Sequence, residues 1–291
     1  MHAFDYATPQ SVADAVVLLN EHGENALVLA GGTDLIVQLR ENRRRAEVVV
    51  DIKGISEANE LSYDVSTGLT IGAAVPCYRI YGDAAIAAAY PGLMDATSLV
   101  GGTAIQGRAS LGGNLCNGSP AGDTIPPMIV LGGVARIAGP DGTREVAVED
   151  FCTAPGRTVL AKGEFLISLH FPTPEVHSGA YYRRFIPRNE MDIAVVGVGA
   201  SVVLCDDLSR FVSARIAVAS VAPTPLFVRD AGDALTGQAV SDESIQKASE
   251  IAQAAARPIS DMRGTAEYRT HLTGVLTRRV LNGAVQRAKE S

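Results

Sequence analysis

Two glycine pairs, each with hydroxyl or amide side chains beside it, constrain this chain more than any other feature. "AGGTD" (30–34) ends the apolar run "ALVLA", which predicts a short buried strand, and "SLGGN" (110–114) lies in a polar stretch. Glycine lacks Cβ, so its backbone can adopt positive φ and a ligand can approach its amides closely. Successive free N–H groups form a concave site for anions, above all phosphate. Two such sites could hold the two phosphates of a dinucleotide; the alternative is that each pair is only a tight turn.

The second glycine pair belongs to a long stretch, 101–123, that is dense in Gly, Ser and Asn. A stretch of this length exceeds a plain turn in a compact domain, which predicts either a functional segment or disorder. Other nucleotide motifs fit less well. The P-loop pattern GxxxxGK[ST] is absent. "GVGASV" (197–202) comes nearest to GxGxxG, but Val202 replaces the third glycine and a strand follows.

Hydrophobic periodicity predicts an α+β protein. Before residue 172 it predicts helices and short strands, including hairpins over 61–73 and about 141–142 and a helical stretch from 77 that ends at Tyr90-Pro91. Pro172, Pro174 and Gly179 mark a change of composition. Paired strands over 191–228 and helices over 241–257 and 261–290 follow. We therefore predict one domain over 1–175, with subdomains of about 1–55 and 56–175, and a second over 176–291.

Charge and hydropathy exclude several classes of function. The formal net charge of −7 argues against a nucleic-acid or anionic-membrane surface. The one basic cluster, Arg40 with Arg43, Arg44 and Arg45, is interpreted as a solvated helix end or loop. No apolar run approaches the roughly 18 residues of a membrane span. The N-terminal segment lacks the pattern of a secretory signal.

The cysteines and histidines predict no metal site. Cys77, Cys116, Cys152 and Cys205 form no CxxC pair and lie far apart, which argues against zinc or an iron–sulfur cluster bound by this chain alone. Reduced thiols in a cytoplasmic protein are the expectation. None of the five histidines has a partner at metal-ligand spacing.

Four segments together resemble a known family. "LVLAGGTDL", "GRASLGGNLCNGSPAGDTIPP", "RNEMDIAVVGVGA" and "AEYRTHLTGVLTRR" are similar to the FAD-binding medium subunit of molybdenum hydroxylases, which include carbon monoxide dehydrogenase and xanthine dehydrogenase. The resemblance covers nearly the whole chain. The "SLGGN" segment with an aspartate nine residues after its asparagine is its most specific part. It implies a two-subdomain FAD-binding domain of the vanillyl-alcohol-oxidase type, followed by a C-terminal antiparallel sheet packed on helices.

The resemblance also implies a set of FAD-binding residues. The wall around the pyrophosphate comprises Val28, Leu29, Ala30, Gly31, Gly32, Thr33, Asp34 and Leu35. The second wall comprises Ser110, Gly112, Gly113 and Asn114. Asp123 is expected to bind ribose hydroxyls, and Leu166 to stack near the isoalloxazine. Arg184, with Arg183 as a rival, is expected to stabilise negative charge on the reduced ring. Thr103 belongs to the same set, as does Val100, where some relatives have an aromatic residue on the ring face.

The function implied by the resemblance is electron transfer. A molybdenum-cofactor large subunit would oxidise a substrate, and a [2Fe–2S] small subunit would pass electrons to FAD in this chain and on to an external acceptor. A dimer of heterotrimers in the cytoplasm is implied. The cofactor does the redox chemistry, so no catalytic side chain is expected. Two alternatives stay open: a stand-alone FAD-dependent reductase or oxidase, and a flavin-free docking subunit.

Overall fold

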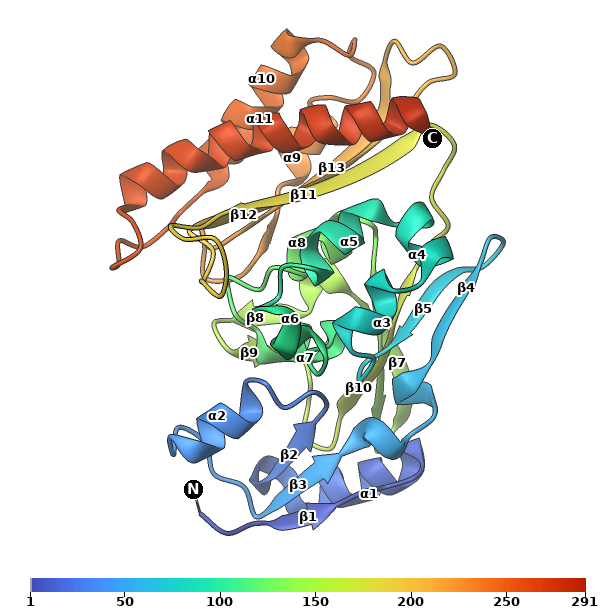
Figure 1. Cartoon of the computed structure of the whole chain (residues 1–291), viewed down its shortest axis with the longest axis vertical. Coiled ribbons are helices and arrows are strands. Elements are labelled where there is room, and N and C mark those ends of the chain that lie inside the picture. Colours follow the sequence, from blue (N-terminus) through green and yellow to red (C-terminus); the bar gives the residue numbers. More distant parts are fainter. Residues whose placement is uncertain (1) are drawn as a thin grey trace.

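The N-terminal part is a small parallel sheet with one covering helix. The computed structural model describes residues 2–291, and Figure 1 shows this part at the bottom of the molecule. Its strands, in the order β1-β3-β2, are β1 (Asp5–Ala7), β3 (Val48–Asp51) and β2 (Ala26–Leu29). Helix α1 (Val12–His22) begins where Ser11 Oγ accepts a hydrogen bond from the Asp14 N–H, and it ends at Gly23 with φ 56°. A second short helix, α2 (Leu35–Arg40), follows the first glycine pair.

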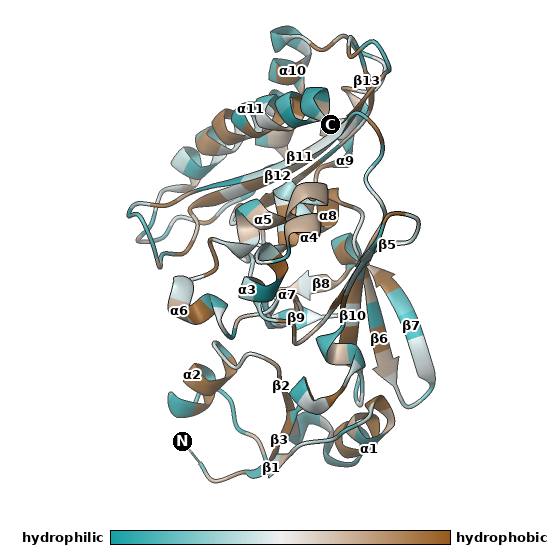
Figure 2. Ribbon diagram, turned by 45° about the vertical axis from the view of Figure 1, so that its right-hand side comes forward, coloured by the Kyte–Doolittle hydropathy of each residue, from teal (hydrophilic) through white to brown (hydrophobic). Residues whose placement is uncertain are grey.

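The middle part is a five-stranded antiparallel sheet of order β4-β5-β10-β6-β7. The strands are β4 (Leu61–Asp64), β5 (Gly68–Gly72), β6 (Val134–Gly139), β7 (Gly142–Ala147) and β10 (Phe165–Phe171). The predicted hairpins are confirmed as β4–β5 and β6–β7. A separate strand pair comprises β8 (Cys152–Ala154) and β9 (Arg157–Thr158). The edge strand β7 is mostly hydrophilic and its neighbour β6 mostly hydrophobic, as expected for an edge that faces solvent (Figure 2).

Six short helices belong to this part, and α7 packs on β10 of the sheet: α3 (Cys77–Tyr81), α4 (Ala84–Ala89), α5 (Pro91–Thr97), α6 (Thr103–Gln106), α7 (Leu111–Asn117) and α8 (Ile125–Val130). The predicted helix end at Tyr90-Pro91 is confirmed, since α4 ends at Ala89 with Tyr90 as its C-cap, but the break between α3 and α4 and the new helix at Pro91 were not predicted. Asp83 accepts hydrogen bonds from two amides and starts α4, and Pro91 occupies the first turn of α5, where its fixed φ suits a helix. The long polar stretch is ordered by α6 and α7.

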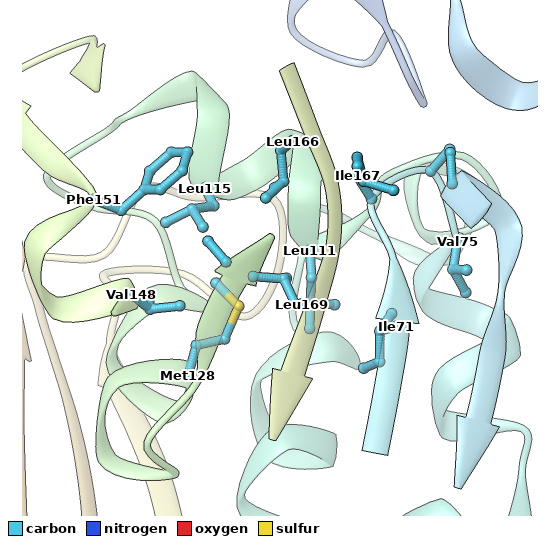
Figure 3. Packing of buried hydrophobic residues seen from close by; sticks show 14 of the residues in the cluster. Ile71, Val75, Leu111, Leu115, Met128, Val148, Phe151, Leu166, Ile167 and Leu169 are labelled. Carbon is cyan, nitrogen blue, oxygen red and sulfur yellow. The ribbon is translucent and has the colours of Figure 1, made fainter. Parts of the chain in front are cut away.

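The core of the first two parts is continuous. Strand β10 lies in the middle of the sheet and is buried along most of its length. Figure 3 shows Leu166 and Leu169 of β10 near Leu111 and Leu115 of α7, with Met128 of α8 nearby. Helix α7 is thereby held against the sheet by its apolar side chains, which fixes where the second glycine pair lies.

The C-terminal part is a four-stranded antiparallel sheet between helices. Its strands, in order, are β11 (Ser178–Phe185), β12 (Val196–Leu204), β13 (Phe211–Ala219) and β14 (Leu226–Phe227). Helices α5 and α8 lie on one face, and α11 (Ala266–Glu290) runs along the other (Figure 1). Helix α10 (Asp242–Ala255) packs beside α11, and α9 (Arg229–Asp233) packs on β13.

Two C-terminal predictions needed correction at their boundaries. Strand β12 begins at Val196 rather than near 191, because 186–195 forms the loop from β11 and Met191 there has φ 51°. Helix α11 begins at Ala266 rather than 261, because Thr265 Oγ1 caps it by accepting the Tyr268 N–H. Among residues 2–291, no helix combines the length and apolarity needed to cross a membrane.

A clasp formed by Arg287 joins the C-terminal helix to the middle part. Arg287 Nη1 and Nη2 donate to the two carboxylate oxygens of Asp95 at 2.6 and 2.8 Å, and Nη1 also donates to the Ala180 carbonyl at 2.7 Å. The guanidinium carbon lies 4.5 Å from the centroid of the Tyr181 ring. A bidentate pair of this kind is among the stronger hydrogen-bonded contacts in proteins.

We expect Arg287→Met to destabilise the protein by about 1.5–3 kcal/mol, the usual worth of hydrogen bonds to a charged group. The substitution keeps the stem of the side chain and removes the clasp, so the thermal midpoint should fall. Arg278→Met, an exposed arginine on the same helix, is the matched control and should leave the midpoint unchanged. Equal effects of the two substitutions would contradict this role.

Candidate functional site: a cavity between two glycine segments

One cavity lies where the N-terminal and middle parts meet. Its empty volume, which includes space open to solvent, is about 890 Å³. The predicted site residues that line it are Val28, Ala30, Gly31, Gly32, Thr33, Asp34, Leu35, Val100, Ser110, Gly112, Gly113, Asn114 and Leu166. Both glycine segments therefore face the same space.

The first segment can approach the second only because residue 31 is glycine. A Cβ added at Gly31 would overlap the carbonyl oxygen of Arg108, and it would also lie 3.2 Å from Ala109 Cα. Gly32 has φ +79°, a conformation that other residues rarely adopt. Lys53 Nζ donates to the Ala30 carbonyl at 3.1 Å, which holds the start of this segment. The bare backbone of the first segment is thus packed directly on the chain that leads into the second.

The second segment is the first turn of helix α7 rather than an isolated loop. Ser110 is the N-cap, and its Oγ accepts a hydrogen bond from the Gly113 N–H at 3.0 Å. A Cβ on Gly112 would lie 2.5 Å from the Ala73 carbonyl oxygen, so this glycine lets α7 pack on the residue that follows β5. A Cβ on Gly113 would meet only Ser110 Oγ, at 3.0 Å. The second wall is therefore the amino end of a helix, where N–H groups lack partners within the helix.

Asn114 and Asp34 give the cavity polar side chains of different kinds. Asn114 Oδ1 accepts a hydrogen bond from the Thr124 hydroxyl at 2.7 Å, so its amide nitrogen is left as the donor for a ligand. Asp34 precedes α2 but makes no side-chain cap, and burial raises the pKa of its carboxyl above the ordinary value. An amide donor and a carboxylate acceptor are groups that can bind the heteroatoms and hydroxyls of a nucleotide.

The remaining wall is apolar. Val28, Val100, Leu160, Phe165 and Leu166 line it, together with Ile52, Ala73, Ala109 and Cys116. Burial raises the pKa of the Cys116 thiol to about 12, so the thiol stays protonated at neutral pH. A pocket that combines bare amides with a broad apolar wall fits a ligand that has both a phosphate group and flat rings.

Four predicted residues lie outside this lining. Leu29 is buried in a small cluster beneath α2, and Thr103 is exposed at the start of α6. Asp123 and Arg184 form an ion pair with each other, and neither lines the cavity. The contact of these four residues with FAD stays a prediction.

The Asp123–Arg184 pair joins the middle part to the C-terminal sheet. Tyr182 and Arg184 lie two residues apart on β11, hence on one face of it, and both donate to the Asp123 carboxylate, Tyr182 Oη at 2.7 Å. Burial raises the pKa of Asp123, and the Arg184 charge opposes that shift. Arg184 Nε is buried without a hydrogen-bond partner among the described residues. Arg183, the alternative to Arg184 in the sequence analysis, is exposed and does not contribute to this ion pair.

Sequence reasoning missed nine residues that line the cavity, and three of them have amide or guanidinium side chains: Gln38, Arg44 and Asn117. Gln38 of α2 donates to Asn117 Oδ1 of α7 at 3.2 Å, which bridges the two walls. Arg44 lines the cavity as well, while all four arginines of its cluster are exposed, in agreement with a solvated helix end or loop. The identities of Gln38 and Asn117 carried no signal, because their meeting depends on contacts between residues 79 positions apart.

Comparison with known protein families finds a match for each half of the chain. Residues 2–174 match the family described as FAD binding domain in molybdopterin dehydrogenase, and residues 180–284 match the CO dehydrogenase flavoprotein C-terminal domain. The carbon monoxide dehydrogenase medium chain of Afipia carboxidovorans is 35% identical over 287 residues, covering 99% of this chain and 98% of the relative. The xanthine dehydrogenase FAD-binding subunit of Escherichia coli O157:H7 is 31% identical over 289 residues, with 98% of each covered.

Solved structures agree over nearly the full length. Reconstituted CO dehydrogenase from Oligotropha carboxidovorans matches with a TM-score of 0.93 at 33% identity, covering 98% of this chain and 99% of that one. A Hydrogenophaga pseudoflava carbon monoxide dehydrogenase that lacks the Mo-pyranopterin moiety of its cofactor matches with the same TM-score at 30% identity, with 98% of each chain covered. The predicted fold class and FAD as the cofactor are confirmed. The chain belongs to the family of FAD-binding medium subunits of molybdopterin-dependent dehydrogenases.

Proposed function

We propose that this chain is the flavoprotein subunit of a molybdenum hydroxylase and carries electrons from a [2Fe–2S] partner subunit, through FAD, to an external acceptor. The observation that carries the proposal is the cavity with two backbone walls, whose close packing a Cβ at Gly31 or Gly112 would disrupt. Bound FAD would supply the redox chemistry. The chain itself would bind the diphosphate with backbone N–H groups and cover the rings with its apolar wall.

The proposed partners are a molybdenum-cofactor large subunit and a [2Fe–2S] small subunit, in a dimer of heterotrimers. Support comes from the relatives, which include medium chains of carbon monoxide dehydrogenase and an FAD-binding subunit of xanthine dehydrogenase. The four cysteines are all free, in keeping with a reducing compartment, and we propose the cytoplasm.

We propose the domain boundaries suggested by the sequence: 1–55 and 56–175 as subdomains around the cavity, and 176–291 as the C-terminal domain. One hydrophobic cluster draws all but one of its buried residues from the first 171 residues, and another lies wholly beyond residue 194. Residues 1–175 and residues 176–291 thus each have a core of their own, as a domain should.

The proposed FAD contacts are the predicted residues. Gly31, Gly32, Ser110, Gly112 and Gly113 would surround the diphosphate, while Asn114 and Leu166 would face the flavin. Arg184 would stabilise negative charge on the reduced ring, with Asp123 and Tyr182 fixing the guanidinium.

The test is purification of the chain alone and of its native complex. We expect the isolated chain to bind FAD without turning over a substrate, and the complex to contain molybdenum and [2Fe–2S] clusters. Anaerobic addition of substrate to the complex should bleach the flavin absorbance. Turnover by the isolated chain would favour a stand-alone reductase or oxidase. No flavin binding after FAD is added would favour a docking subunit.

A further inference from the structure

The charged residues of the cavity are few. Within residues 2–291, the cavity lining contains one acidic side chain, Asp34, and one basic side chain, Arg44. A diphosphate is anionic, and backbone N–H groups offer it only partial positive charge. Asp34 would repel it. The full positive charge that the lining can supply therefore comes from Arg44.

A tight turn after α2 brings Arg44 to the cavity. Asn42 has φ 57°, and the Arg43 and Arg44 amides both donate to the Gln38 carbonyl, at 2.9 and 3.4 Å. The chain thus folds back over the last turn of α2 and places Arg44 beside Gln38. The Gln38 side chain in turn donates to Asn117 of the opposite wall. Arg44 consequently lies where both walls of the cavity are in contact.

The neighbouring arginines differ from Arg44. Arg43 forms an ion pair with Glu41 at 2.6 Å, and neither Arg40 nor Arg45 lines the cavity. Arg44 is exposed and forms no ion pair within the described part of the chain, so its guanidinium is available. A guanidinium can donate two parallel hydrogen bonds to phosphate oxygens, which suits it to this ligand better than lysine.

We propose that Arg44 binds the diphosphate of FAD and is the cation of the site. The inference rests on the proposed FAD site and adds to it a residue outside the glycine segments. Because Arg44 reaches the cavity from its exposed rim, its attraction to the diphosphate should weaken as salt increases.

The experiment compares FAD with riboflavin, which lacks phosphate. The full chain, freed of flavin, is titrated with each ligand at low and high NaCl, and flavin fluorescence reports binding. The variants are Arg44→Ala, Arg44→Lys and, as the matched control, Arg45→Ala. We expect Arg44→Ala to weaken FAD binding about tenfold at low salt and to flatten its salt dependence, with riboflavin binding unchanged. Arg44→Lys should restore part of the affinity, and Arg45→Ala should match the unsubstituted chain.

Three other outcomes would each overturn the proposed role of Arg44. Equal FAD affinities for Arg44→Ala and Arg45→Ala would overturn the role of Arg44 and leave the proposed function standing. An equal loss of FAD and riboflavin binding in Arg44→Ala would show an effect on the fold of the cavity, and would also overturn it. No FAD binding by the unsubstituted chain would overturn both proposals.

Discussion

Replacing Gly31 by alanine should weaken FAD binding by about 100-fold. The added methyl group would overlap the Arg108 carbonyl, a backbone atom that cannot move aside without shifting the chain that leads into α7. Overpacking of this kind costs about 1–3 kcal/mol, and the upper end corresponds to roughly a hundredfold in affinity. Titration of the flavin-free chain with FAD, followed by fluorescence, measures the loss, and circular dichroism checks that the variant is folded.

Substitutions at two further glycines provide a comparison for Gly31→Ala. Gly112→Ala should behave like Gly31→Ala, because its Cβ would lie 2.5 Å from the Ala73 carbonyl oxygen. Gly107→Ala is the matched control, since its Cβ would meet only the Ala104 carbonyl oxygen at 3.8 Å, and FAD affinity should not change. A Gly31→Ala chain that binds FAD as well as Gly107→Ala does would show that the close approach of the two segments is unimportant.

Replacing Asp123 by alanine should destabilise the protein by about 3–5 kcal/mol, the usual cost of removing one partner of a buried ion pair. The Arg184 side chain is only 4% exposed, so its charge would be left without an anion, and the Tyr182 hydroxyl would lose its acceptor. The measurement is denaturant unfolding followed by circular dichroism. Arg183→Met, on the same strand and exposed, is the control and should cost little.

A double substitution separates the effect of the ion pair on stability from the effect of side-chain packing. Asp123→Ala combined with Arg184→Met removes both charges, and it should recover much of the stability that Asp123→Ala loses. If the double variant is as unstable as the sum of the two single variants, the two residues do not act as a pair. The cofactor content of the same variants tests separately whether Asp123 also contacts FAD.

The sequence predicted the parts of the site that depend on local chemistry. Glycines 31, 32, 112 and 113 could be identified from the sequence because the lack of a Cβ gives the backbone conformational freedom and lets a ligand approach it closely. The structure brings both pairs to one cavity. The helical start of α7 was not predicted. Its capping depends on a single serine, Ser110, in a stretch rich in turn-forming residues.

The parts that sequence reasoning missed depend on tertiary contacts. Arg44 reaches the cavity only through the reversal at Asn42, and an arginine cluster on its own is typical of a solvated surface. The pairing of Asp123 with Tyr182 and Arg184, about 60 positions away, was not predicted, and the expected contact of Asp123 with FAD stays a prediction. That pairing arises from how β11 lies against the middle part, which no local pattern encodes.

The cysteine in the cavity wall has a consequence for the durability of the protein. Sulfur is oxidised through its thiolate, and Cys116 lies in the pocket proposed to hold FAD. With its pKa raised to about 12, this thiol remains almost wholly protonated under physiological conditions. The apolar surroundings that bury Cys116 thus keep its sulfur in the thiol form, which is oxidised less readily than the thiolate.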